Sequence, residues 1–143
     1  MKRYFAAVFF LLLALAACAA PAAGPAAGNS TSKVTVDGGS YTNVSPAALN
    51  QMLAQKSFPL INVHIPYQGE IANTDAFIPY DQIENNLSKL PSDKNAKIVL
   101  YCRSGNMSTI AAKKLVSLGY TDVWNLDGGM DAWQQAGLPL IRK

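Results

Sequence analysis

The chain has 143 residues, which is enough for one globular domain and too short for two. Half of its residues are hydrophobic and 15% are charged, and this balance excludes a largely disordered chain. Only one stretch is apolar enough to suggest a membrane segment, so a multi-pass membrane protein is excluded. The formal charge of +3 includes Lys2 and Arg3 of that stretch, and without them it does not indicate a nucleic-acid partner.

The first residues resemble a bacterial lipoprotein signal peptide. Lys2 and Arg3 form a basic start, residues 8–17 are an uninterrupted apolar run, and the small residues end at Cys18. The apolar run is short for a membrane span. We therefore expect residues 1–17 to be removed and Cys18 to carry a lipid. An ordinary signal peptide that is cut after a later alanine is the alternative.

A linker is predicted between this segment and the globular part. Residues 21–32 are rich in Pro, Ala, Gly and Ser and have neither charge nor hydrophobic periodicity, which is typical of a flexible spacer. A linker of this length spans about 20 Å on average. We expect residues 18–32 to be the lipidated cysteine and its spacer, and residues 33–143 to be the folded domain. The lipid would hold that domain on the extracytoplasmic side of the cell membrane or outer membrane.

The pattern in residues 33–143 predicts strands that alternate with helices. β-rich or short apolar runs predict strands at 33–36, 60–64, 98–101 and 123–126. Helical spacing or capping residues predict helices at 47–55, 81–90, 108–118 and 130–136. Ser45 supplies the N-cap of the first helix and Pro46 its first position. This alternation predicts an α/β fold with a mostly parallel sheet and helices on both faces.

Cys102 directly follows the predicted strand 98–101, at the sheet edge where ligands of such folds bind. If Cys18 carries lipid, Cys102 is the one remaining thiol, and an unpaired thiol in an exported protein points to reactivity. The short loop and helix that follow bring backbone N–H groups and a helix dipole to one place, and both stabilise an anion. The pattern therefore predicts a nucleophilic cysteine in an anion-binding loop. A buried, inert cysteine is the alternative.

Sulfur chemistry and phosphate chemistry both fit a nucleophilic cysteine in such a loop. Tyrosine-type phosphatases place an arginine after five intervening residues to bind the phosphoryl oxygens, and this chain has Ser108 there. A phosphatase or an arsenate-reducing enzyme is therefore disfavoured.

The segment from Tyr101 to Ser108 resembles the active-site loop of single-domain rhodaneses, which are sulfurtransferases. It has an arginine in the second position from the cysteine and a glycine in the fourth. Residues 123–133 and 136–139 are similar to the C-terminal signature of the family, and residues 61–79 fall where its first signature lies. The resemblance extends over about residues 44–140 and implies a rhodanese-like fold.

The resemblance also implies a mechanism, with Cys102 as the catalytic residue. Its thiolate would take sulfur from a small donor such as thiosulfate, form a persulfide, and pass the sulfur to cyanide, a thiol or a protein acceptor. Arg103 would attract the substrate or form a structural salt bridge. The loop would bind the substrate through backbone N–H groups of Ser104, Gly105, Asn106 and Met107. Ser108 closes this substrate-binding loop and is expected to cap the helix. No cofactor is implied, and no residue cluster has the spacing of metal ligands.

Four residues depart from the family pattern. Asn62 and His64 stand where the family has an aspartate and an arginine, Glu70 replaces a histidine, and Met107 replaces an arginine or threonine. The loss of a cation or hydroxyl at the loop weakens the case for a small dianion such as thiosulfate. A non-catalytic binding or redox-relay module at the cell envelope therefore stays open as the second hypothesis. His64, the single histidine, is a candidate base, although the family mechanism requires none.

Overall fold

The computed structural model describes residues 28–143 of the chain. The predicted signal peptide, Cys18 and most of the predicted spacer lie outside the described residues, so lipid attachment stays a prediction. Among the described residues, no helix has the length and apolar character that crossing a membrane requires.

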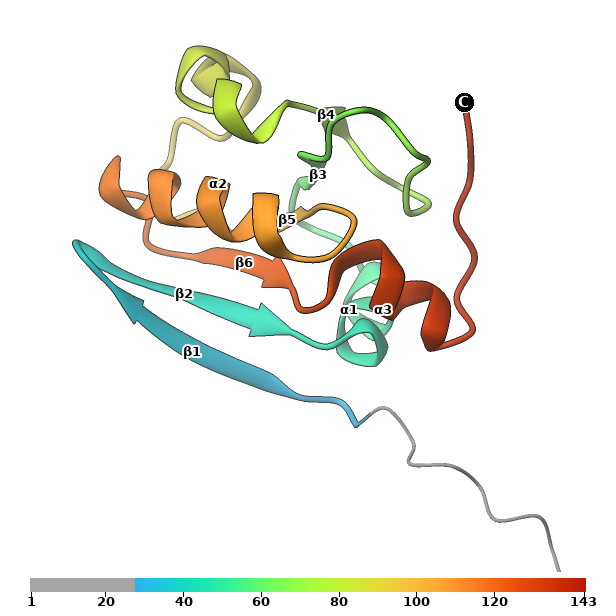
Figure 1. Cartoon of the computed structure of the whole chain (residues 1–143). Coiled ribbons are helices and arrows are strands. Elements are labelled where there is room, and N and C mark those ends of the chain that lie inside the picture. The colour runs from blue at the N-terminus through green and yellow to red at the C-terminus, as the bar shows by residue number, and fades with distance from the viewer. Residues whose placement is uncertain (1–27) are drawn as a thin grey trace, which may run out of the picture.

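A six-stranded sheet forms the centre of the domain (Figure 1). Its strands are β1 (Thr31–Val36), β2 (Gly39–Val44), β3 (Leu60–Asn62), β4 (Ala76–Phe77), β5 (Ile98–Tyr101) and β6 (Val123–Leu126). The order across the sheet is β1-β2-β6-β5-β3-β4. β1 is antiparallel to β2, and all the other neighbours are parallel. The predicted mostly parallel sheet is confirmed.

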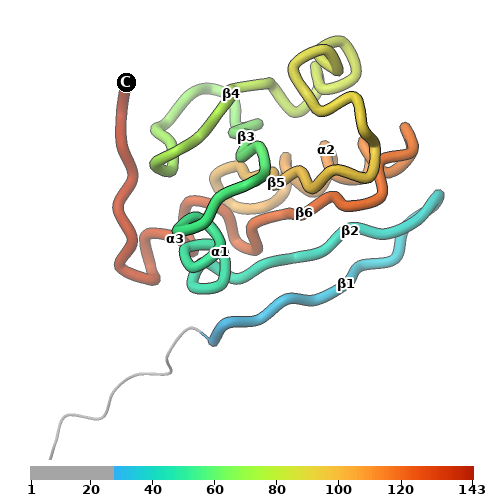
Figure 2. The backbone as a smooth tube through the Cα atoms, turned by 180° about the vertical axis from the view of Figure 1, so that it is seen from behind, coloured from blue at the N-terminus to red at the C-terminus, as the bar shows by residue number. Residues whose placement is uncertain are grey.

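Helices cover both faces of this sheet, as predicted. They are α1 (Pro46–Leu53), α2 (Asn106–Ser117), α3 (Gly129–Gln135) and the 3-10 helices η1 (Tyr80–Gln82) and η2 (Glu84–Lys89). Figures 1 and 2 show α2 on one face and α1 with α3 on the other. Each face has its own apolar core. Leu100 of β5 packs in the cluster beneath α2, whereas the next residue, Tyr101, packs in the cluster beneath α1 and α3.

The first helix begins as the sequence predicts. Ser45 is the N-cap of α1 and accepts a hydrogen bond from the backbone N–H of Ala48 (3.3 Å), and Pro46 is the first helical residue. The Ser45 hydroxyl also donates to the carbonyl oxygen of Gly28 (2.9 Å) and accepts from the N–H of Ser30 (3.1 Å). These bonds attach the start of the described chain to the carboxyl end of β2.

Two predicted elements need correction, and one strand was not predicted. β1 begins at Thr31, inside the predicted spacer, because residues 31 and 32 pair with β2. β2 was not predicted, because few of its side chains are buried and its pairing partners lie elsewhere in the chain. The predicted helix 81–90 is instead a pair of 3-10 helices with a kink at Asn86. The Asn86 side chain donates to the carbonyl oxygen of Gln82 (2.8 Å), which competes with regular helical bonding.

Candidate active site

Cys102 lies in a tight turn between β5 and α2, with its sulfur enclosed. The Sγ atom accepts a hydrogen bond from the backbone N–H of Gly105 (3.1 Å) and lies 3.3 Å from the hydroxyl of Ser108. Only 1% of the residue is exposed. Gly105 has a φ of +93°, a left-handed conformation that glycine adopts without strain and that turns the chain into α2. The strand, the turn and the helix together hold the sulfur in one place.

The start of α2 differs from the prediction at Ser108. The helix begins at Asn106 with Gly105 as its N-cap, so Ser108 lies in the first turn and is not the cap. A serine is a favourable N-cap and led the sequence prediction to this residue, but the left-handed Gly105 ends the loop three residues earlier. The Ser108 hydroxyl contacts the carbonyl oxygen of Gly105 (3.1 Å) as well as the sulfur. Met107 is also helical, and it packs against the apolar core beneath α2.

The shift of the helix start brings the N-terminal end of α2 to the Cys102 turn, where the Gly105 N–H and the Ser108 hydroxyl contact the sulfur. The first N–H groups of a helix have no acceptor within the helix, and the helix dipole adds positive potential there. In α2 these are the N–H groups of Asn106, Met107 and Ser108. A thiolate, or a sulfur anion attached to it, is the kind of group that such donors stabilise.

The start of α3 is hydrogen-bonded to the backbone of the same loop. The N–H of Met130 donates to the carbonyl oxygen of Cys102, and the N–H of Asp131 donates to that of Arg103, both at 2.9 Å. Gly128 and Gly129 have positive φ values of 69° and 59° and let the backbone approach this closely. A side chain on Gly129 would collide with the carbonyl oxygens of Cys102 and Arg103. The two glycines thus form a tight turn that lets α3 pack against the Cys102 loop.

Arg103 forms a salt bridge at the mouth of the loop. Its Nε lies 3.4 Å from Oδ1 of Asp131 on α3, and the two side chains are 56% and 44% exposed. A surface pair of this kind contributes about 0–1 kcal/mol. Arg103 is therefore held near the loop by a weak interaction that an anionic substrate can compete with.

His64 is a buried residue that follows β3. Within residues 28–143 no hydrogen bond joins the His64 and Cys102 side chains, and Nε2 of His64 has no partner there. Asn62 binds two backbone groups: its Nδ2 donates to the carbonyl oxygen of Gly69 (3.0 Å), and its Oδ1 accepts from the N–H of His64 (3.0 Å). These neutral residues organise the loop after β3, and the geometry supports a structural role for them.

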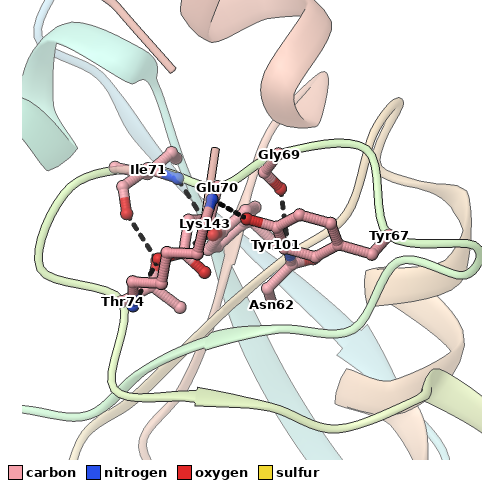
Figure 3. Close-up of polar contacts among 8 residues, drawn as sticks. All are labelled: Asn62, Tyr67, Gly69, Glu70, Ile71, Thr74, Tyr101 and Lys143. Atoms are coloured by element: carbon pink, nitrogen blue, oxygen red, sulfur yellow. Dashed lines mark hydrogen bonds and ion pairs between the residues drawn. The ribbon is translucent and has the colours of Figure 1, made fainter. Parts of the chain in front are cut away.

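The sequence did not predict a role for the buried hydroxyl of Tyr101, the residue before Cys102, whose side chain packs in the core on the opposite face of the sheet. The hydroxyl of Tyr101 accepts from the N–H of Ile71 (3.0 Å) and lies 2.7 Å from Oγ1 of Thr74 (Figure 3). Burial raises the pKa of Tyr101 to about 12. The hydroxyl fixes the segment after β3 to the strand that carries Cys102. A tyrosine in an otherwise aliphatic buried strand was the available signal, because its hydroxyl needs a partner.

We expect Tyr101→Phe to destabilise the fold by about 1–3 kcal/mol, because the buried N–H of Ile71 loses its acceptor. Urea unfolding measures this loss. The matched control is Tyr41→Phe, since Tyr41 is also buried but its hydroxyl makes no hydrogen bond within residues 28–143. An equal loss in both variants would contradict the assigned role of the Tyr101 hydroxyl.

The same hydroxyl predicts a dependence of stability on alkaline pH. The folded protein keeps the Tyr101 proton up to a pKa of about 12, whereas the unfolded chain releases it near 10.0. The stabilisation is therefore complete below pH 10 and is lost as the pH rises toward 12. Between pH 10 and pH 12 the free energy of unfolding of the wild type should fall by up to about 2–3 kcal/mol more than that of Tyr101→Phe.

Ser108→Ala should slow the reaction of the Cys102 sulfur about ten-fold, because the side-chain donor is lost while the backbone donors remain. The rate of alkylation by iodoacetamide measures this. Ser117→Ala is the control, because that hydroxyl binds a carbonyl oxygen at the other end of α2. Equal rates in Ser108→Ala and the wild type would show that this hydroxyl does not stabilise the thiolate.

A cavity of about 620 Å³ lies beside the loop. Arg103 and Met130 connect it to the loop, and Cys102 itself is not among its lining residues. The other walls come from the segment after β3, from α3 and from the last residues of the chain, namely Tyr67, Gln68, Gly69, Asp131, Gln134, Leu140, Arg142 and Lys143. In the part of the chain that the structure describes, no group of three or more His, Cys, Asp or Glu residues is placed to hold a metal ion.

Comparisons with known proteins agree with this geometry. A sulfurtransferase of Allochromatium vinosum is 37% identical over 102 residues, which cover 68% of this chain and 92% of that protein. An uncharacterized protein of Synechocystis is also 37% identical over 102 residues, covering 69% of this chain and 55% of the relative, so the chain spans only about half of that protein. The solved structure of a rhodanese-related protein of Thermoplasma volcanium superposes with a TM-score of 0.61 at 26% identity, over 71% of this chain and 98% of that one.

The family follows from these matches together with the loop. The model of the rhodanese-like domain matches residues 45–136, which is most of the described domain and includes β3, β5, β6 and all of the α-helices. The chain belongs to the family of rhodanese-like domains.

Proposed function

We propose that the protein is a sulfurtransferase that carries sulfur as a persulfide on Cys102. The observation that carries the proposal is the position of the Cys102 sulfur, which accepts from the Gly105 N–H and contacts the Ser108 hydroxyl at the positive end of α2. The relative from Allochromatium vinosum, named a sulfurtransferase, supports it. So does a 26% identical relative from Vibrio cholerae, which is named a thiosulfate sulfurtransferase.

The proposed reaction has two steps. With thiosulfate as donor, the Cys102 thiolate attacks the outer sulfur, a new S–S bond forms, and the old S–S bond breaks as sulfite leaves with its electron pair. Cyanide then attacks the outer sulfur of the persulfide. Thiocyanate leaves and the Cys102 thiolate is restored. No proton is transferred in either step with these reactants, so the absence of a hydrogen bond between His64 and Cys102 within residues 28–143 is consistent with the scheme.

Formation of thiocyanate from thiosulfate and cyanide tests this proposal. Turnover that is absent from a heat-denatured sample supports it. If neither thiosulfate nor an organic persulfide gives turnover, the proposal fails and a non-catalytic binding or redox-relay module takes its place. A phosphate ester serves as the negative control, and we expect no hydrolysis because Ser108 replaces the phosphatase arginine.

A further inference from the structure

The cavity beside the loop is larger than thiosulfate needs. Its volume of about 620 Å³ lies within the range of about 300–1,000 Å³ that holds ligands of drug size, whereas thiosulfate, a sulfate ion with one oxygen replaced by sulfur, is far smaller than such ligands. Gln68 and Gln134 are among its lining residues, and their side-chain amides are hydrogen-bonding groups that match those of a peptide. The space and its lining fit a substrate that extends well beyond the reacting sulfur.

One wall of the cavity is the segment 138–143, which lies beyond the residues that the family model matches. Two backbone hydrogen bonds of 2.8 Å, between Glu70 and Ile141, pair this segment with the loop after β3. The Nε1 of Trp133 donates to the carbonyl oxygen of Pro139 (3.0 Å) and fixes its beginning. Figure 1 shows it running from α3 past this loop. The wall is thus attached at both ends.

Charge distinguishes Arg142 from the other two cations of the cavity. Arg103 is paired with Asp131, and Lys143 is paired with the buried carboxylate of Glu70 at 2.6 Å (Figure 3). Hydrogen bonding to Glu70 also raises the pKa of Lys143. Within residues 28–143, Arg142 forms no ion pair. Among the three cations that line the cavity, Arg142 is therefore the one without a salt bridge in the described residues, and its guanidinium is a group that binds carboxylates in a bidentate manner.

We propose that Arg142 is a specificity-determining residue that binds a carboxylate of the sulfur donor, and that this donor is the persulfide of a small peptide thiol. The inference rests on the proposed function and names the substrate class of the same site. The Cys102 thiolate attacks the outer sulfur of the donor, a new S–S bond forms, and the S–S bond of the donor breaks. The peptide thiolate leaves with the electron pair and takes up the proton of the donor persulfide.

Glutathione persulfide and the persulfide of glutathione diethyl ester are the probes, because they share one skeleton and differ in their carboxylates. The rate of sulfur loading gives kcat/KM for each. Arg142→Ala should lower kcat/KM for the free acid about five-fold through KM, and should change that for the diester by less than about two-fold. Arg142→Lys should restore part of the loss, because lysine keeps the positive charge but cannot bind a carboxylate in a bidentate manner. Lys113→Ala is the control, because it removes an exposed cation beside the β1–β2 turn, and it should change neither value.

Each other outcome identifies which proposal fails. If Arg142→Ala leaves kcat/KM for the free acid unchanged, or lowers kcat/KM equally for both probes, Arg142 does not bind the carboxylate of the donor. The sulfurtransferase proposal is unaffected by either result. If the wild type is loaded with sulfur by thiosulfate but not by glutathione persulfide, the peptide persulfide is not the donor, and again only this inference fails. If no donor loads sulfur, the proposed function and this inference fail together.

Discussion

Cys102→Ser should lower thiocyanate formation by at least about a thousandfold, because an un-ionised hydroxyl replaces the thiolate and no persulfide can form. The expected loss is large because the neighbouring donors have no nucleophile left to act on. Steady-state turnover with thiosulfate and cyanide measures it.

The variant should remain folded, since serine is close to cysteine in size and the Gly105 N–H and the Ser108 hydroxyl can bind its hydroxyl. A urea midpoint near that of the wild type verifies this. Arg103→Ala is a useful comparison, because Arg103 is exposed and only weakly paired. We expect this variant to lose far less of its turnover than Cys102→Ser does. Turnover by Cys102→Ser within about ten-fold of the wild type would exclude the cysteine as nucleophile.

Gly129→Ala is expected to damage both stability and activity. The new methyl group would meet the carbonyl oxygens of Cys102 and Arg103, which are backbone atoms that cannot rotate away. The positive φ of 59° adds strain for any residue other than glycine. We expect a loss of at least about 3 kcal/mol in the free energy of unfolding. A displaced loop would also slow turnover about a hundredfold.

Gly137→Ala separates the effect of the steric collision from the effect of the positive φ. Gly137 also has a positive φ (77°), but an added methyl group would meet no atom within 4 Å. This variant should therefore lose only about 1–2 kcal/mol from backbone strain and keep its activity. Urea unfolding and turnover of both variants give the comparison. If the two glycine variants behave alike, the close approach of α3 to the Cys102 loop is not what Gly129 provides.

The sequence predicted those elements whose signals are local. The strands 98–101 and 123–126 agree with β5 and β6 residue for residue, because short, mostly apolar runs that are almost entirely buried leave little ambiguity. The Ser45–Pro46 start of α1 was also predictable, since capping depends on neighbouring residues. β2 was not, because its place in the sheet depends on pairing with β1 and β6.

In the site, too, the features that depend on neighbouring residues were predictable, and those that depend on distant residues were not. The position of Cys102 after a buried strand follows from the sequence, and so does a loop that leads into a helix. The contact of Ser108 with the sulfur was missed, because serine's preference for N-caps outweighed the permissive conformation of Gly105. The support from α3 and the cavity wall at 138–143 bring together residues distant in the chain. Such contacts depend on tertiary packing, which periodicity and spacing do not encode.

Intact-protein mass spectrometry shows directly whether Cys102 accepts a sulfur atom. The protein is measured before and after incubation with thiosulfate or glutathione persulfide, beside Cys102→Ser. We predict that the wild type alone gains the mass of one sulfur atom and that cyanide removes it. No gain with either donor, or an equal gain in Cys102→Ser, would show that Cys102 does not carry the sulfur.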